Sequence, residues 1–258
     1  MYDVDVAVDE FRLLPAVIDP SFSTAFLALI DRERPSLFIP TVSEELPVVS
    51  RLAKDIRKRG CSVFISPVHA VDTAHDKLRT MRFFEKTDVA VPRTFDAATP
   101  RDVILKELDL PFLAKPRIGR GGRGVVVYNS EAEYRADRRG DLIFQEFIPG
   151  EEFDVNLFAG ENGSTTTSVV LRKTALKQGI VGNALSVERD LHPAVDALGR
   201  RTATLLGLAG PLDMDVRLRT DGTPVLIEIN ARVGGNVPAA PEILDALVDA
   251  WIQKLRSS

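Results

Sequence analysis

The chain has 258 residues, of which 45% are hydrophobic and 27% are charged, values that are typical of a folded globular protein. A net charge of −4 gives no electrostatic signature of general nucleic-acid binding, and Cys61, the only cysteine, excludes a disulfide framework and a cysteine metal site. The lone cysteine, the absence of a secretory leader and the lack of an apolar run of about 18 residues favour the cytoplasm over secretion or membrane insertion.

The first part of the chain alternates between helices and short strands. Helices are predicted at residues 25–30 and 44–59, and strands at residues 36–40 and 62–66. Such alternation predicts a parallel sheet with helices packed on its faces. We assign residues 1–72 to this α/β domain.

The rest of the chain predicts an α+β arrangement. Asp76 is placed to cap a helix that runs to about residue 86. Residues 111–148 read as strand, glycine-rich turn, strand, helix and strand, and the remainder is mostly antiparallel sheet with helices at 193–206 and 241–255. We assign residues 73–258 to a second domain, divided into subdomains 73–145 and 146–258.

A lysine followed by a glycine-rich loop is the first candidate site. Lys115 ends an apolar strand, and the loop that follows contains Gly119, Gly121, Gly122 and Gly124. Such a loop lets backbone N–H groups approach phosphate oxygens, and a lysine there neutralises phosphate charge. A flexible turn explains the glycines equally well, because the loop matches neither a Walker motif nor a dinucleotide fingerprint.

Two shorter segments carry weaker signals. Lys77 lies in the first turn of its predicted helix, against the helix dipole, and would be better placed beside an anion. Residues 141–155 form an apolar strand that runs into an acidic turn and out again. Strand ends of this kind can line an adenine site, with a carboxylate accepting hydrogen bonds from ribose hydroxyls, although a solvated hairpin is the alternative.

A predicted β-hairpin near the C-terminus has one polar face. Apolar and polar residues alternate in both arms, so that residues two apart share a face. The polar face consists of Asp213, Asp215 and Arg217 in the first arm and of Glu228 and Asn230 in the second. The predicted pairing places Asp213 opposite Asn230.

The register of this hairpin suggests a cation site. A two-residue turn at 221–222 places Leu218 opposite Val225 and, further along, Asp215 opposite Glu228. Carboxylates that face each other across two strands destabilise the pair unless a positive group lies between them. Oxygen ligands suit Mg²⁺, which commonly binds together with nucleotide phosphates. A hairpin whose acidic face meets water is the alternative.

Taken together in order and spacing, these motifs resemble the ATP-grasp superfamily. The resemblance covers residues 8–236 and is to the branch of the carbamoyl-phosphate synthetase large chain and related carboxylate-amine ligases. It implies a partial pre-ATP-grasp (Rossmann-like) domain followed by an ATP-grasp fold of two α+β subdomains with antiparallel sheets. The motifs that carry it are Asp76-Lys77, Lys115 with its glycine loop, Gln145-Glu146-Phe147-Ile148, Gly150-Glu151-Glu152, Asp215 and Glu228-Ile229-Asn230-Ala231-Arg232.

The resemblance implies roles for individual residues around ATP and Mg²⁺ or Mn²⁺. Asp213 is expected to lie just outside the metal ligands. Arg232 lies where relatives keep an arginine near the transferred phosphoryl group, so Arg232 and Lys115 are the expected catalytic side chains. The other roles are phosphate binding by Lys77, Lys115, Gly119, Gly121, Gly122 and Gly124, adenine binding by Glu146, Phe147 and Ile148, ribose binding by Glu152, and metal binding by Asp215, Glu228 and Asn230.

The implied reaction is attack of a carboxylate on the γ-phosphate of ATP, which gives an acyl phosphate that an amine or similar nucleophile then opens. Two alternatives remain. The first is that the chain is an ATP-binding module that has no turnover of its own or that forms half of a split complex. The second is phosphorylation of bicarbonate or carbamate, as in carbamoyl-phosphate synthetase. The expected partners are small-molecule carboxylates and amines, not nucleic acid or membranes. For the carboxylate, Arg172, Lys173 and Lys177 are candidates, although a solvated basic edge explains them as well.

Family members usually begin with a strand, a glycine-rich turn, a helix and a second strand that this sequence does not show. We therefore expect a parallel sheet without its first strands. Such a sheet exposes backbone hydrogen-bonding groups at its edge, which is a liability. A second subunit or a partner chain is expected to cover that edge.

Overall fold

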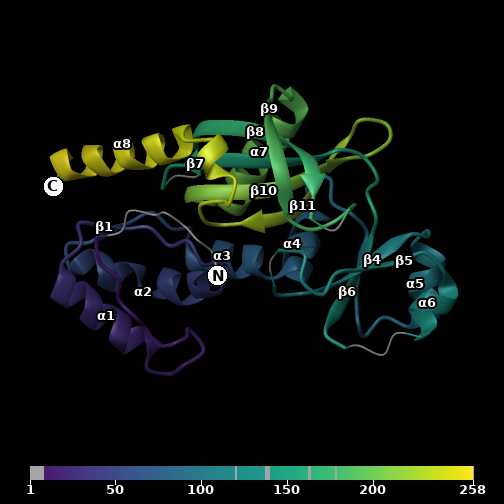
Figure 1. Ribbon diagram of the computed structural model, residues 1–258, viewed down its shortest axis with the longest axis horizontal. Coiled ribbons are helices and arrows are strands. Elements are labelled where there is room, and N and C mark those ends of the chain that lie inside the picture. The colour runs from purple at the N-terminus through teal and green to yellow at the C-terminus, as the bar shows by residue number, and fades with distance from the viewer. Residues whose placement is uncertain (1–8, 120, 137–139, 162–163, 178, 258) are drawn as a thin grey trace.

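The computed structural model describes residues 9–119, 121–136, 140–161, 164–177 and 179–257 (Figure 1). In its N-terminal part, helices surround a parallel pair of two-residue strands. Helix α1 buries Phe22, Phe26 and Ile30, a four-residue spacing that places all three on one face. The elements are α1 (Phe22–Glu33), β1 (Leu37–Phe38), η1 (Ser43–Glu45), α2 (Leu46–Lys58), β2 (Ser62–Val63) and α3 (Val68–His75).

A second group of elements forms a small lobe around an antiparallel sheet of strand order β3-β6-β4-β5. Aromatic rings fill its core, with the ring of Tyr134 5.1 Å from that of Phe112 and 5.2 Å from that of Phe144. The elements are α4 (Lys77–Phe84), β3 (Thr94–Asp96), α5 (Arg101–Glu107), β4 (Phe112–Pro116), β5 (Val126–Tyr128), α6 (Glu131–Ala136) and β6 (Leu142–Glu146).

The third group is built on an antiparallel sheet of strand order β11-β10-β7-β8-β9. Helix α7 contacts β7, β8 and β11, and helix α8 contacts β7, β8 and β10. The elements are β7 (Glu152–Ala159), β8 (Thr165–Leu176), β9 (Ala184–Asp190), α7 (Pro193–Leu206), β10 (Gly210–Leu218), β11 (Pro224–Asn230), η2 (Val237–Ala239) and α8 (Glu242–Ser257).

These elements confirm the predicted fold class, a small parallel α/β part followed by two antiparallel sheets with packed helices. The largest hydrophobic core joins the N-terminal helices to the five-stranded sheet, because Phe26 and Ile56 belong to the same cluster as Val155 and Leu157. The aromatic lobe has a core of its own. The domain division at residues 72 and 73 stays a prediction.

The register of the β10–β11 hairpin is partly as predicted. Asp215 lies opposite Glu228 and Asp213 opposite Asn230, as expected. The predicted pairing of Leu218 with Val225 is wrong, since Leu218 lies opposite Pro224 and a bulge separates that pairing from the one at Asp215.

The turn explains the difference. The N–H of Arg219 donates to the carbonyl of Thr223 (2.9 Å), and that of Gly222 donates to the carbonyl of Arg219 (3.0 Å). The loop therefore has three residues, and Gly222 takes the left-handed conformation (φ 84°) that such a loop requires. The register shifts by one residue, and the bulge at Ile227 restores it before the acidic pair.

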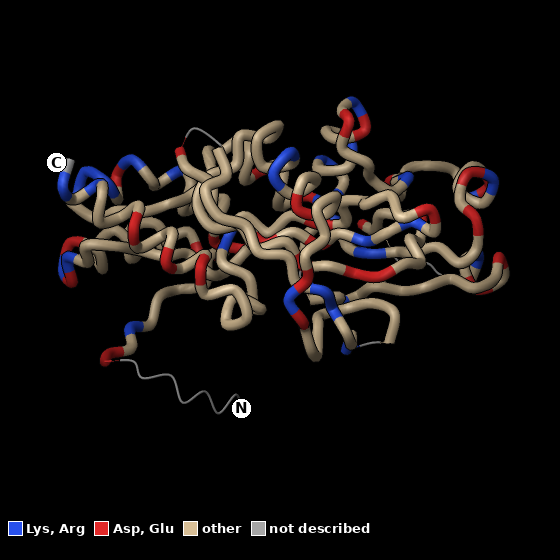
Figure 2. Tube along the Cα trace, turned by 90° about the horizontal axis from the view of Figure 1, so that it is seen from above, with Lys and Arg blue, Asp and Glu red and all other residues tan. Residues whose placement is uncertain are grey.

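Charged residues of both signs are interspersed along the whole length of the molecule (Figure 2). Within the described residues, every helix is too short or too polar to cross a membrane.

Candidate functional site

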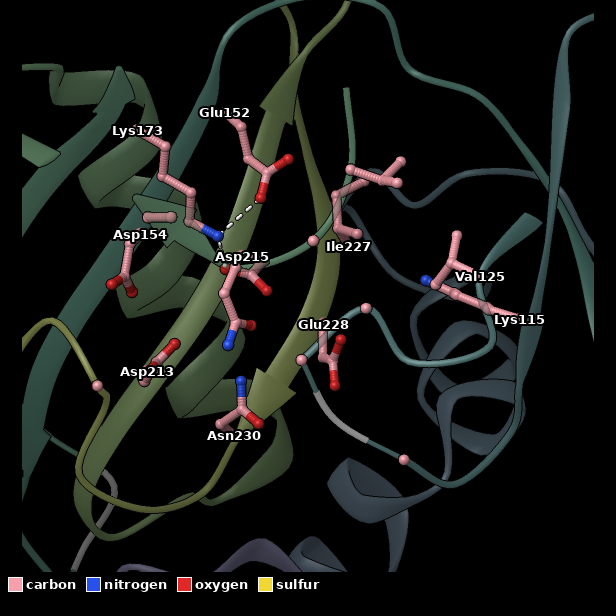
Figure 3. Close-up of a pocket in the computed structure, with 18 of the residues that line it drawn as sticks. Lys115, Val125, Glu152, Asp154, Lys173, Asp213, Asp215, Ile227, Glu228 and Asn230 are labelled. Carbon is pink, nitrogen blue, oxygen red and sulfur yellow. Dashed lines mark hydrogen bonds and ion pairs between the residues drawn. The ribbon is translucent and has the colours of Figure 1, made fainter. Parts of the chain in front are cut away.

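A pocket of about 1000 Å³ lies between the aromatic lobe and the five-stranded sheet. The lobe contributes the end of β4 and the glycine loop, and the large sheet contributes β7, β8, β10 and β11 (Figure 3). The predicted site residues that line it are Lys77, Lys115, Gly119, Gly121, Gly122, Glu146, Ile148, Glu152, Asp213, Asp215, Glu228, Asn230 and Arg232. The structure thus brings together residues that are far apart in the sequence.

The three predicted metal ligands lie side by side on the pocket face of β10 and β11 (Figure 3). Each of the two carboxylates is paired with a lysine. Asp215 Oδ1 lies 2.5 Å from Lys173 Nζ, and Glu228 Oε1 lies 3.1 Å from Lys77 Nζ. The facing acids therefore attract positive charge, and their oxygen-only donor set fits Mg²⁺.

The first predicted phosphate lysine, Lys77, is fixed by the start of helix α4. The Asp76 carboxylate accepts hydrogen bonds from the backbone N–H groups of Leu78 and Arg79, as expected of a helix cap. The Lys77 side chain is turned into the pocket, where Nζ donates to the carbonyl of Gly119 at 2.7 Å. Lys77 therefore links the helix to the glycine loop and to Glu228.

The second predicted phosphate lysine, Lys115, ends β4 and is 5% exposed. Its pKa is lowered to about 8, mainly by burial and also by the nearby charge of Lys77, against the opposing effect of Glu228. A buried lysine held near its titration range favours any ligand that brings negative charge. Phosphate groups are such ligands.

The glycine loop is shaped by backbone conformations that favour glycine. Gly121 and Gly124 have φ values of 67° and 75°. A Cβ atom on Gly124 would lie 3.0 Å from the Pro116 side chain, and one on Gly121 would lie 3.3 Å from the amide of Asn183. The loop therefore lies against the connection between β8 and β9, at the edge of the pocket.

The predicted adenine segment connects β6 to β7. Glu146 forms an ion pair with Arg219. The Ile148 carbonyl accepts a hydrogen bond from Arg217 (2.9 Å). The Phe147 ring lies 5.3 Å from the Arg217 guanidinium and, unlike Ile148, does not line the pocket. The segment is held by two arginines of β10 and the following turn.

Glu152, the predicted ribose ligand, is bound by two cations. Its Oε1 atom accepts from Lys173 Nζ and its Oε2 atom from Arg217 Nε, both at 2.7 Å. The Lys173 side chain is 5% exposed, so the solvated-edge interpretation does not describe it. Burial alone would lower the pKa of Lys173, but Asp215 and Glu152 raise it above its usual value. Lys173 therefore stays charged and connects the predicted ribose and metal ligands.

Arg172 and Lys177 differ from Lys173. Arg172 is 39% exposed and pairs with Glu151 and Glu188, which fits a solvated basic edge. Lys177 lines the pocket near the glycine loop. The structural roles of Lys173 and Arg217 were missed in the sequence, although Arg217 alternates with the two aspartates of β10.

Arg232, the predicted catalytic arginine, follows the end of β11. Its NH1 group donates to Asp213 Oδ2 (2.9 Å), and Nε donates to the Ser43 hydroxyl (3.3 Å). The loop after β11 approaches Asp213 closely at Gly234, where a Cβ atom would lie 2.2 Å from Asp213 Oδ2. A larger residue at position 234 would displace Asp213.

The acidic end of the pocket contains one more carboxylate that sequence reasoning missed. Asp154, on β7, lies opposite Asp215, and one carboxylate oxygen each of Asp154, Asp213 and Asp215 lie within 4.8 Å of one another. Burial, and then the charges of Asp213 and Asp215, raise the pKa of Asp154 well above its usual value. Alternation of Glu152 and Asp154 with apolar residues is the signal that would have found it.

A family model of the ATP-grasp domain matches residues 74–236, which is more than half of the chain. The chain belongs to the ATP-grasp domain family. It is 23% identical over 227 residues to the carbamoyl phosphate synthase large chain of Campylobacter jejuni, covering 82% of this chain and 21% of that protein. It is 28% identical over 191 residues to the D-alanine–D-alanine ligase of Cupriavidus taiwanensis, covering 66% of this chain and 58% of the ligase.

Solved structures support the same fold. The L-amino acid ligase of Bacillus licheniformis gives a TM-score of 0.68 at 20% identity, over 88% of this chain and 56% of that one. The D-alanine–D-alanine ligase of Bacillus anthracis gives a TM-score of 0.65 at 14% identity, over 90% of this chain and 85% of that one. The chain spans about a fifth of the carbamoyl phosphate synthase relative and somewhat over half of the Cupriavidus ligase.

Proposed function

We propose that this ATP-grasp protein is an ATP-dependent ligase that activates a carboxylate as an acyl phosphate for attack by an amine. The proposal is supported by one pocket that contains two lysines suited to binding phosphate and three side chains with oxygen ligands of the kind that Mg²⁺ prefers. Lys77 and Lys115 reach it from the lobe, and Asp215, Glu228 and Asn230 from the large sheet.

The chain's own residues bind and orient the nucleotide. Lys115 and Lys77 neutralise the phosphates, and the glycine loop offers backbone N–H groups to their oxygens. The segment from Glu146 to Ile148 holds the adenine, and Glu152 holds the ribose. Glu152 and Ile148 suit these roles because Lys173 and Arg217 fix them in place.

Asp215, Glu228 and Asn230 would hold Mg²⁺, which would supply positive charge to the phosphate oxygens. Lys77, which is paired with Glu228 in the structure, would then be available to the phosphates. Arg232 lies at the same end of the pocket as the metal ligands and stabilises the charge of the transferred phosphoryl group. Phosphoryl transfer of this kind needs positioning and neutralisation, and no side-chain nucleophile.

Bicarbonate is a second candidate for the activated carboxylate. Similarity to the carbamoyl phosphate synthase large chain favours it. So does the fold of a biotin carboxylase domain that was solved with MgADP and bicarbonate, which gives a TM-score of 0.69 at 16% identity, over 86% of this chain and 54% of that one. The product would then be carboxyphosphate in place of an organic acyl phosphate.

An assay of ADP release tests the proposal. Mg²⁺-ATP is supplied with a panel of amino acids, small carboxylates and bicarbonate, with and without amines. A ligase releases ADP only when a carboxylate and an amine of the correct pair are present. Tight binding of Mg²⁺-ATP without ADP release from any pair, both by this chain and by a longer chain extended before Met1, would instead favour a binding module without turnover.

A further inference from the structure

One carboxylate oxygen at the acidic end of the pocket has no partner. Asp154 is 1% exposed, and its Oδ2 atom accepts a hydrogen bond from the Asn236 amide at 2.7 Å. Its Oδ1 atom is buried and without a hydrogen-bond partner among the described residues, although Asp154 lines the pocket. A buried carboxylate oxygen of this kind is costly unless a ligand completes its hydrogen bonding.

Three cationic side chains form ion pairs at this end of the pocket. Lys173 pairs with Glu152 and Asp215, Arg217 pairs with Glu152, and Arg232 pairs with Asp213. Within the described part of the chain, the structure gives Asp154 no ion-pair partner. Of the four carboxylates named here, Asp154 is therefore the one without a cationic partner among the described residues.

From this geometry we infer that Asp154 and Asp213 form the subsite for the amine substrate, which binds there as a primary ammonium ion. The inference rests on the proposed ligase function and names the class of its acceptor. Both carboxylates lie on the pocket face of the sheet (Figure 3), and Asp213 contacts Arg232. An ammonium held between them therefore lies next to the arginine expected at the transferred phosphoryl group.

The position suits the second half-reaction. The bound ammonium releases one proton to solvent, and its nitrogen lone pair forms the C–N bond with the acyl carbon. The bond between that carbon and the phosphate oxygen breaks, and the remaining proton leaves with the phosphate as HPO₄²⁻. Negative side chains around the amine concentrate a cationic acceptor and disfavour an anionic one.

An ammonium ion suits this subsite better than a divalent metal ion does. Arg232 already occupies one oxygen of Asp213. Its guanidinium would repel a divalent ion placed between Asp154 and Asp213. An ammonium group carries a single charge and donates up to three hydrogen bonds. The free Oδ1 atom of Asp154 and one neighbouring oxygen atom are therefore enough to bind it.

The test uses the full chain saturated with Mg²⁺ and a non-hydrolysable ATP analogue. Calorimetry measures the binding of L-amino acids and short diamines, each compared with its N-acetylated, uncharged derivative. We expect saturable binding of at least one amine and not of its acetylated partner. In Asp154→Asn the affinity for that amine falls by at least about 30-fold. Asp55→Asn, on the exposed face of α2, serves as the control and changes nothing.

Three results contradict the inference: no amine binds to the nucleotide-loaded protein, the acetylated derivatives bind as well as the amines, or Asp154→Asn binds the amine as well as the wild type does. Mn²⁺ uptake without nucleotide that Asp154→Asn abolishes would also overturn it, and would assign a metal ion to the subsite. Failure of the proposed function is separable, because the ADP-release assay would then show no turnover with any carboxylate and amine, whereas the calorimetry reports only whether the amine binds. The thermal unfolding of Asp154→Asn shows that the variant is folded.

Discussion

Replacing Arg232 with alanine is expected to lower the turnover number by about 100-fold or more while Mg²⁺-ATP still binds. The proposed function places this arginine beside the transferred phosphoryl group, where positive charge is worth most in the transition state. Its removal also leaves Asp213 without its ion-pair partner. Steady-state ADP release gives kcat, and calorimetry with an ATP analogue gives the affinity for the nucleotide.

Two further variants separate this role from a structural one. Arg232→Lys keeps the charge but not the two-point geometry, and is expected to recover part of kcat. Arg189→Ala removes an exposed arginine that pairs with Glu242 away from the pocket, and is expected to leave kcat unchanged. Full activity of Arg232→Ala with the correct substrates would show that the assigned role is wrong.

Replacing Lys115 with methionine is expected to stabilise the protein and to abolish nucleotide binding. Burial lowers the pKa of this lysine from 10.5 to about 8, so the folded protein at pH 7 holds a charge that its surroundings disfavour. A shift of this size corresponds to about 3 kcal/mol of lost stability. Methionine fills a similar volume without the charge, and the gain in the free energy of unfolding is at most of that order.

The pH dependence of stability checks this explanation. Between pH 8 and pH 10.5 an unfolded Lys115 holds its proton while the folded one does not, so the stability of the wild type rises with pH there. The stability advantage of Lys115→Met is therefore greatest below pH 8 and disappears toward pH 10.5. Lys58→Met, on an exposed lysine of α2, is the control. An advantage that does not change with pH would contradict the assignment.

Much of the site followed from short-range patterns. Alternation placed Asp215, Glu228 and Asn230 on one face of a hairpin, and a hairpin brings such residues together whatever the rest of the fold does. Asp76 indicated the start of α4, because its side chain is suited to capping a helix. Lys115 and its glycines were visible because a strand end and a glycine loop are local features.

The hairpin turn is a feature that the local sequence does not determine. An Asp-Gly pair is compatible with a two-residue turn and with a three-residue loop that ends in a left-handed glycine. The chain adopts the second, and the bulge at Ile227 then recovers the pairing of Asp215 with Glu228. The choice depends on how β10 packs between β7 and β11, which the turn sequence does not specify.

The contacts of Lys173 and Asp154 depend on the pairing of strands that are far apart in the sequence. A lysine on a polar strand is most often solvated, and nothing near Lys173 in the sequence shows that Glu152 and Asp215 will surround it. Those contacts arise because β7 lies between β8 and β10 in the sheet. Strand order of this kind is set by the whole fold, so these partners became visible only in the structure.

The proposed nucleotide site is tested most directly by calorimetry of Mg²⁺ and a non-hydrolysable ATP analogue on the wild type and on Asp215→Asn and Glu228→Gln. We expect one nucleotide per chain, with an affinity that depends on Mg²⁺ in the wild type and loses that dependence in both variants. A folded wild-type protein that takes up no Mg²⁺-nucleotide, or variants whose Mg²⁺ dependence equals that of the wild type, would contradict it.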